Sequence, residues 1–168
     1  MDAVDRVREG AEGCDVIVAR ESVGLPRRVL RTMEEPPGSG PLAGIDAGLQ
    51  VLPPARPGDL VLVCAVDSPG IGKCIPQLCR ALDDNSVSHL AGAVAFGGTP
   101  QPRRQLLQGV YRRVSLEATI VASGMVINRS VHSVLGKLDL LDVPVGPEVC
   151  RDLDTPDDLE WWRHHAAD

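Results

Sequence analysis

The sequence predicts an α/β fold in which a mostly parallel sheet carries helices on both of its faces. Apolar, strand-like segments alternate with helical segments along most of the chain, which is the pattern of such folds. Hydrophobic residues make up 43% of the chain and aromatic residues only 2%, so the core must be aliphatic. Strands rich in valine, isoleucine and leucine are typical of parallel sheets that helices cover. A length of 168 residues fits one domain, residues 1–168.

The predicted strands are short apolar runs bounded by glycine, proline or charged residues. They are Cys14–Ala19, Arg28–Met33, Asp59–Val66, Ala91–Phe96 and Leu140–Val145. Among them, Asp59–Val66 is the most continuously apolar, and we therefore expect it to lie at the centre of the sheet.

The predicted helices have apolar residues at helical spacing. They are Asp2–Glu9, Pro41–Leu52, Ile75–Leu82, Pro102–Val114, Ser130–Leu138 and Thr155–His165. The last begins with a capping pattern, because Pro156 follows Thr155 and Asp158 comes three residues after it. Residues 115–121 could end a helix or form a short strand.

The net charge of −6 argues against a general nucleic-acid binder, although it leaves room for a single nucleotide. No apolar run approaches the length of a membrane span, and acidic residues follow Met1 where a signal peptide would be basic. We therefore expect a cytoplasmic protein with reduced thiols. A zinc site at Cys74 and Cys79 is a weaker alternative, because no paired cysteines or histidines follow them at ligand spacing.

A glycine-rich turn, Gly38–Gly40, leads into a predicted helix that starts at Pro41. The start of a helix presents free N–H groups and the positive end of the helix dipole. Gly44 and Gly48 lie four residues apart and so share a helix face, which a base, a ribose or another backbone could approach closely. Tight helix packing would explain the same glycines equally well.

Four acidic residues are candidates for ligand binding. Asp67 follows the strongest predicted strand, where ligands of open α/β sheets bind, and a carboxylate there can hold Mg²⁺ or cap the next helix. Asp152 and Asp154 are two residues apart in an extended stretch, so their side chains point the same way. Glu35 could accept hydrogen bonds from guanine, or it could be an ordinary exposed residue. His132 has no visible partner. Arg103 and Arg104 could attract phosphates, but a solvated helix surface is the favoured interpretation.

Taken in order, three motifs resemble the molybdenum-cofactor guanylyltransferases. They are Gly40-Pro41-Leu42-Ala43-Gly44, an apolar strand that ends in Asp67-Ser68-Pro69, and Asp154-Thr155-Pro156-Asp157-Asp158-Leu159. The resemblance implies a three-layer, Rossmann-like nucleotidyltransferase fold. It also implies a Mg²⁺-dependent enzyme that transfers GMP from GTP to molybdopterin and releases pyrophosphate.

The resemblance assigns roles to the motif residues. It makes Asp67 the metal-binding and catalytic residue, and it places Glu35 and the stretch Gly40 to Gly44 around guanine and ribose. Asp152 and Asp154 fall on the molybdopterin side, where some family members carry asparagine. Partners of this chain would be the two substrates, with a homo-oligomer or other molybdenum-pathway proteins as further possibilities.

Two departures from the family leave other functions open. The aspartates at 152 and 154 also suit a cytidylyl- or sugar-phosphate nucleotidyltransferase. The family's first strand and its glycine-rich loop with arginine and lysine do not match any part of this sequence, so we expect the sheet to lack that strand and GTP to bind weakly. A non-catalytic binding or scaffold protein is the corresponding alternative.

Overall fold

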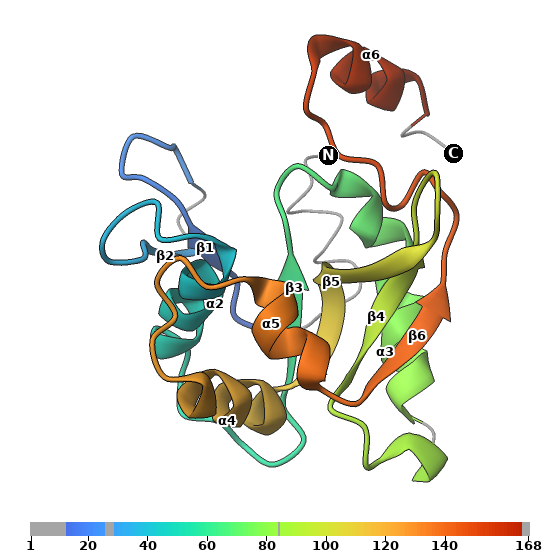
Figure 1. The fold of residues 1–168 in the computed structure, drawn as a ribbon. Helices are drawn as coiled ribbons and strands as arrows, with labels where there is room; N and C mark the ends of the chain where they lie inside the picture. The colour runs from blue at the N-terminus through green and yellow to red at the C-terminus, as the bar shows by residue number, and fades with distance from the viewer. Residues whose placement is uncertain (1–12, 26–28, 84, 166–168) are drawn as a thin grey trace.

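The computed structural model describes residues 13–25, 29–83 and 85–165, and the helix predicted over residues 2–9 lies outside them. The described strands form two sheets (Figure 1). A small parallel sheet pairs β1 (Val16–Val18) with β2 (Leu30–Thr32), which confirms two of the predicted strands. The larger sheet has the order β3-β5-β4-β6, and its strands are β3 (Leu60–Cys64), β5 (Arg103–Arg112), β4 (Gly92–Gly97) and β6 (Leu140–Pro144).

Helices cover both faces of the larger sheet, and the predicted three-layer α/β fold is confirmed (Figure 1). The helices on one face are α2 (Pro41–Gln50), α4 (Arg113–Ser123) and α5 (Val131–Val134). On the other face lies α3 (Ile75–Asp83). Short 3₁₀ helices occupy Pro69–Lys73 (η1), Asn85–Val87 (η2) and Leu135–Lys137 (η3), and α6 (Pro156–His165) stands at the upper end of the view. Within the described ranges no helix is both long and apolar enough to span a bilayer.

The core consists of two aliphatic clusters separated by the larger sheet. On the α2 and α4 side, Leu42 and Leu116 are fully buried and pack with Tyr111 of β5. On the α3 side, Ile75 and Leu78 pack with other buried residues, among them Val110 of β5. Because neighbouring side chains of β5 point into opposite clusters, this strand contributes to both halves of the core.

The helix predicted over Pro102–Val114 is wrong, because residues 103–112 form β5, which pairs antiparallel with β3 and β4. β3, β4 and β6 all run in one direction, and β5 runs against them. The apolar residues of this segment fit helical spacing, but Gly109 is the signal that was missed. A β-carbon there would lie 2.7 Å from Val94 Cγ1 of β4. A glycine inside a strand often marks such a close approach.

β5 contains a bulge near the carboxyl end of β3. Val94 pairs with Gly109 and the next residue, Ala95, pairs with Gln105, so residues 106–108 have no partner in β4. The hydroxyl of Tyr111 donates to the carbonyl of Leu106 over 2.7 Å and holds the bulge in place. Bulges commonly redirect side chains near functional sites.

The expectation that Asp59–Val66 is central is also wrong, because β3 lies at one end of the four-stranded sheet. Its side chains still face two layers, since Val61 and Val63 pack toward one core cluster and Leu62 toward the other. A continuously apolar strand therefore indicates two covered faces and does not by itself indicate a central place.

The helices predicted over Pro41–Leu52, Ile75–Leu82 and Thr155–His165 are confirmed with small shifts of their ends. The helix predicted over Ser130–Leu138 divides into α5 and the 3₁₀ helix η3. Residues 115–121, which were ambiguous, lie inside α4. The capping pattern before α6 is present: the Thr155 hydroxyl accepts from the Asp158 N–H at 3.2 Å, and the Thr155 N–H donates to Asp158 Oδ2 at 3.1 Å. This reciprocal pair fixes where the chain enters α6.

Removing the Tyr111 hydroxyl should destabilise the protein through the bulge. In Tyr111→Phe the buried carbonyl of Leu106 loses its donor, and we expect the free energy of unfolding to fall by about 1–3 kcal/mol. Urea denaturation followed by circular dichroism measures this change. As a control, Val114→Ala on α4 removes a side chain that is 58% exposed and should change stability by less than about 0.5 kcal/mol. Equal effects of the two variants would contradict this account of the bulge.

Candidate functional site

A cavity of about 330 Å³ opens beside the carboxyl end of β3. One wall comes from the turn after β3 and from the loop before α6, and the other comes from β5 and α5. The residues that line it are Ala65, Asp67, Ser68, Arg103, Arg104, Gln105, Leu106, Leu107, Gln108, Val131, His132 and Asp152. This position, outside the carboxyl end of a strand, is where open α/β sheets bind their ligands.

Ser68 brings two of the predicted carboxylates together at this cavity. Its side chain is 2% exposed, and its hydroxyl lies 2.5 Å from Asp152 Oδ1 and 3.5 Å from Asp67 Oδ1. The backbone N–H of Leu153 also donates to the carbonyl of Asp67 over 2.8 Å. These contacts join segments that lie 84 residues apart in the sequence and hold the two aspartates at one wall.

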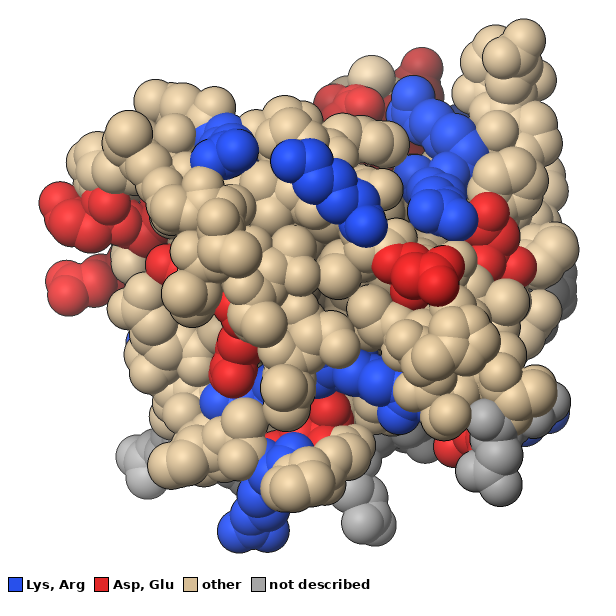
Figure 2. Space-filling model, turned by 60° about the horizontal axis from the view of Figure 1, so that its bottom comes forward, with Lys and Arg blue, Asp and Glu red and all other residues tan. Residues whose placement is uncertain are grey.

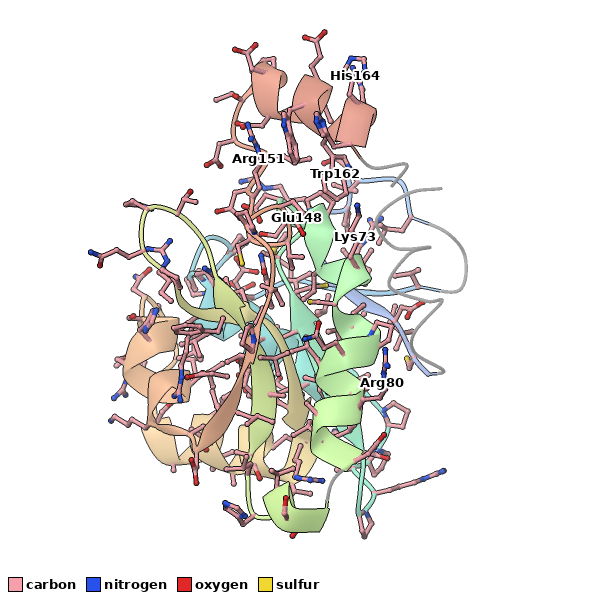
Figure 3. All side chains as sticks on the ribbon, turned by 90° about the vertical axis from the view of Figure 1, so that its right-hand side faces the viewer. Lys73, Arg80, Glu148, Arg151, Trp162 and His164 are labelled. Carbon is pink, nitrogen blue, oxygen red and sulfur yellow. The ribbon has the colours of Figure 1, made fainter. Side chains whose placement is uncertain are left out.

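Asp154, the third predicted carboxylate, is exposed and does not line this cavity. The neighbouring Arg151 is held from the side of α6: its Nη2 lies 2.7 Å from Asp158 Oδ1, and its guanidinium stacks 4.3 Å from the Trp161 ring. Figure 3 shows Arg151 between α6 and the rest of the protein, with Lys73 of η1 below Trp162. The contacts of Arg151 with Asp158 and Trp161 therefore hold the loop that carries Asp152 against α6.

Two arginines and a histidine line the cavity from β5 and α5. Arg104 is committed to an ion pair, with its Nε 2.6 Å from Asp142 Oδ1. Arg103 and His132 form no ion pair with an aspartate or glutamate of the described residues. Gln108 is 3% exposed, and its Oε1 has no hydrogen-bond partner within the described part of the chain. The cavity thus combines two carboxylates, two guanidinium groups, an imidazole and a buried carboxamide.

The oxygen atoms at this cavity fit a hard divalent cation better than a soft metal. Asp67 and Asp152 supply carboxylate oxygens at this cavity. Mg²⁺ is usually held by one or two carboxylates together with phosphates and water. Across residues 13–25, 29–83 and 85–165 no cluster of three or more histidine, cysteine or acidic side chains is placed to hold a metal alone. The donors therefore suit Mg²⁺ that arrives with a phosphate ligand.

Cys150 lies near Asp152 but is not an activated nucleophile. Burial is the main cause that raises its pKa above the ordinary value of 9.0, and the charges of Asp152 and Glu148 raise it further. The positive charge of Arg103 lowers the pKa of this thiol, which places the guanidinium in the same neighbourhood. A protonated thiol is a weak nucleophile, so Cys150 is unsuited to covalent catalysis.

A second hollow, of about 540 Å³, lies at the ends of β1 and β2. It is lined by Ala19, Arg20, Glu21, Arg31, Thr32, Met33 and Pro37. The loop after β1 and the turn after β3 both lie toward the top of Figure 1, so both cavities belong to the same end of the molecule. The predicted base-binding residue Glu35 is exposed in the loop between Met33 and Pro37.

The glycine-rich motif lies partly at the surface and partly in the core. Gly40, with φ of 93°, caps α2, and Pro41 is the exposed first residue of this helix. Leu42, Ala43 and Gly44 are buried. A β-carbon at Gly44 would lie 3.6 Å from Val18 Cγ1 of β1, so this glycine lets α2 pack closely on β1. Gly40 and Pro41 are the residues of this motif that are not buried.

Comparison with known proteins identifies the family. The sequence pattern of the MobA-like NTP transferase domain matches residues 2–137. The chain belongs to this family. A crystal structure of molybdopterin-guanine dinucleotide biosynthesis protein A from Archaeoglobus fulgidus is similar with a TM-score of 0.50 and 18% identity, over 83% of this chain and 69% of that one. No curated protein is similar enough to count as a match. The MobA-like domain is a nucleotidyltransferase domain, and the fold agrees with it.

Sequence reasoning found one wall of the site and missed the other. Asp67 and Asp152 were both candidates, although their meeting at one cavity was not predicted, and Gln108, Arg103 and His132 were not recognised as neighbours of Asp67. The reason is that residues 103–112 were assigned to a helix, which hid the bulge that turns Gln108 toward the cavity. On the face that Figure 2 shows, acidic and basic side chains are interspersed, and no broad basic surface stands out there.

Protonation of Asp158 at low pH should loosen the attachment of α6 to the loop before it. The Thr155 hydroxyl, and after it the Arg151 guanidinium, hydrogen-bond this carboxylate and hold its pKa below the ordinary value of 3.8. A carboxyl group with a lowered folded-state pKa contributes stability above its unfolded-state pKa and loses it as the pH falls through the folded-state value. We therefore expect the fluorescence of Trp161 and Trp162, which both lie on α6, to change as the pH falls below 3.8.

The matched variants for this titration are Asp158→Asn and Asp157→Asn, both in the first turn of α6. Asp158→Asn should show the altered fluorescence already at neutral pH, because it lacks the carboxylate that Arg151 and Thr155 bind. Asp157→Asn should titrate like the wild type. Identical titrations of the wild type and Asp158→Asn would overturn the role of this carboxylate.

Proposed function

We propose that this protein transfers GMP from GTP to the phosphate of molybdopterin and releases pyrophosphate, with Mg²⁺ as the required cation. The observation that carries the proposal is the meeting of Asp67 and Asp152 at one cavity, at the carboxyl end of β3. Membership of the MobA-like NTP transferases supports nucleotidyl transfer as the type of reaction. The name of the similar Archaeoglobus fulgidus protein supports molybdopterin as the acceptor.

In this reaction an oxygen of the acceptor phosphate attacks the α-phosphorus of GTP. The bond from that phosphorus to the oxygen bridging the α- and β-phosphates breaks, and pyrophosphate leaves with the electron pair. The chain's own task is to hold two anionic groups in line and to neutralise their charge. Bound Mg²⁺ would supply positive charge to the phosphates, and Asp67 and Asp152 would hold it.

Ser68 acts in this scheme as a positioning residue. Its buried hydroxyl donates to Asp152, so that carboxylate keeps a fixed orientation beside Asp67. The Leu153–Asp67 backbone bond restrains the same loop. Burial raises the pKa of the Cys150 thiol, and we therefore assign this residue no role as a nucleophile.

The nucleotide base would lie toward β1 and β2. The hollow beside Arg31 and Pro37 opens next to Glu35, whose carboxylate could accept from the N1–H and amino groups of guanine. Gly40 and Pro41, at the start of α2, would contact the ribose or a phosphate. Asp154, which is exposed beyond the cavity, would meet the part of the acceptor that extends away from its phosphate.

Asp67→Asn tests the metal role with little change in size. We expect it to lower Mg²⁺-dependent GTP affinity and to slow pyrophosphate release by roughly 10²- to 10³-fold, as the loss of one charge-stabilising group commonly does. Titration calorimetry with and without Mg²⁺ and a pyrophosphate-release assay measure these effects. Asp139→Asn, at an exposed residue before β6, is the matched control and should behave like the wild type.

A panel of nucleotides tests the base preference independently of the metal role. With molybdopterin as acceptor, GTP should release pyrophosphate faster than CTP, ATP or UTP, and Glu35→Gln should reduce this preference. Preference for CTP would instead favour a cytidylyltransferase. Tight binding of GTP without any turnover would favour a binding or scaffold protein.

A further inference from the structure

The strongest unexplained feature of the site is the buried carboxamide of Gln108. Its side chain is 3% exposed, and its Oε1 is the one buried side-chain oxygen or nitrogen of the described residues that lacks a hydrogen-bond partner. A buried acceptor without a donor destabilises a folded protein, whereas an apolar side chain of the same size would not. The position therefore suits a residue whose partner is a ligand.

The β5 bulge directs Gln108 into the cavity. Residues 106–108 are the ones that lack partners in β4, and all three line this cavity. The Tyr111 hydroxyl holds the bulge at Leu106, and the carbonyl of Leu107 accepts from the Ala65 N–H over 3.0 Å. Hydrogen bonds at Leu106 and Leu107 therefore fix the backbone that carries the carboxamide.

The surrounding charges indicate an anionic ligand on this side. Arg103 and His132 line the same cavity and form no ion pair among the described residues, whereas Arg104 beside them is neutralised by Asp142. A free guanidinium and an imidazole N–H are suitable donors for a phosphate group. Asp67 and Asp152 line the same cavity and would repel a phosphate unless a cation lay between them.

We propose that Arg103, His132 and Gln108 form the subsite for the phosphate end of the acceptor substrate. Arg103 and His132 bind the phosphate, and the Gln108 carbonyl accepts a hydrogen bond from an N–H or O–H group close to that phosphate. The assignment rests on the proposed nucleotidyl transfer, which needs a second phosphate beside the one held at Asp67. It makes Gln108 a specificity-determining residue, because an acceptor without the donor group leaves the buried carbonyl unpaired.

Two small phosphate monoesters test the subsite directly on the full chain. The probes are 2-hydroxyethyl phosphate, which carries a donor next to its phosphate, and ethyl phosphate, which lacks it. Binding is measured by titration in nuclear magnetic resonance spectra. Arg103→Gln should weaken both probes by about 10-fold or more, since it removes a charge-assisted hydrogen bond. Arg80→Gln, at an exposed arginine on α3 (Figure 3), is the charge-matched control and should change neither affinity.

Gln108→Met separates a ligand role from a structural one. Methionine fills a similar volume but cannot accept this hydrogen bond, so we expect about 2- to 10-fold weaker binding of 2-hydroxyethyl phosphate and unchanged binding of ethyl phosphate. The same variant should melt a few degrees higher, because it removes a buried unpaired acceptor. A lower melting temperature with unchanged affinity for both probes would overturn the proposal.

Measuring Mg²⁺-GTP binding on the same proteins keeps this subsite apart from the proposed function. Arg103→Gln and Gln108→Met should bind Mg²⁺-GTP like the wild type. If both variants lose affinity for Mg²⁺-GTP together with affinity for the monoesters, the cavity binds the nucleotide phosphates and the acceptor subsite is wrong. If the wild type binds 2-hydroxyethyl phosphate but not Mg²⁺-GTP, the subsite stands and guanylyl transfer fails. If neither monoester binds the wild type, the subsite fails alone.

Discussion

The larger sheet depends on β5, because β3 is hydrogen-bonded to the rest of that sheet only through this strand. β5 runs against its neighbours, sends Tyr111 into one core cluster and Val110 into the other, and carries the bulge beside the cavity. A single strand therefore joins the core to the site. The close approach at Gly109 and the Tyr111–Leu106 hydrogen bond set where the bulge falls, and the bulge in turn sets the direction of Gln108.

The second constraint is the tie between the turn after β3 and the loop before α6. Ser68 is buried beside both aspartates, and its hydroxyl together with the Leu153–Asp67 backbone bond holds Asp67 and Asp152 close together. The far end of the loop is held by Arg151 against Asp158 and Trp161. Carboxylate and guanidinium groups that line one cavity at the end of a sheet suit a reaction in which two phosphate groups must be aligned.

The parts predicted best from the sequence are those that local physical chemistry determines. Proline at the start of α2 and the Thr155–Asp158 capping pattern identify helix starts, and Asp67 follows an apolar strand as expected. The bulge and the edge position of β3 depend on which strands pair, and pairing joins residues far apart in the sequence. The burial of Gly44 likewise depends on the packing of α2 against β1, and although β1 is predicted as a strand, no local pattern identifies it as the partner of α2.

The central claim is that a divalent cation and a nucleotide meet at the cavity between Asp67 and Asp152. Paramagnetic broadening by Mn²⁺, added with GTP in place of Mg²⁺, tests it most directly because the effect falls steeply with distance from the ion. The account predicts that the amide signals of Ser68, Gln108 and Leu153 broaden first and that Asp67→Asn abolishes this pattern. Broadening centred instead on the histidines at the end of α6, or spread evenly over the protein, would contradict it.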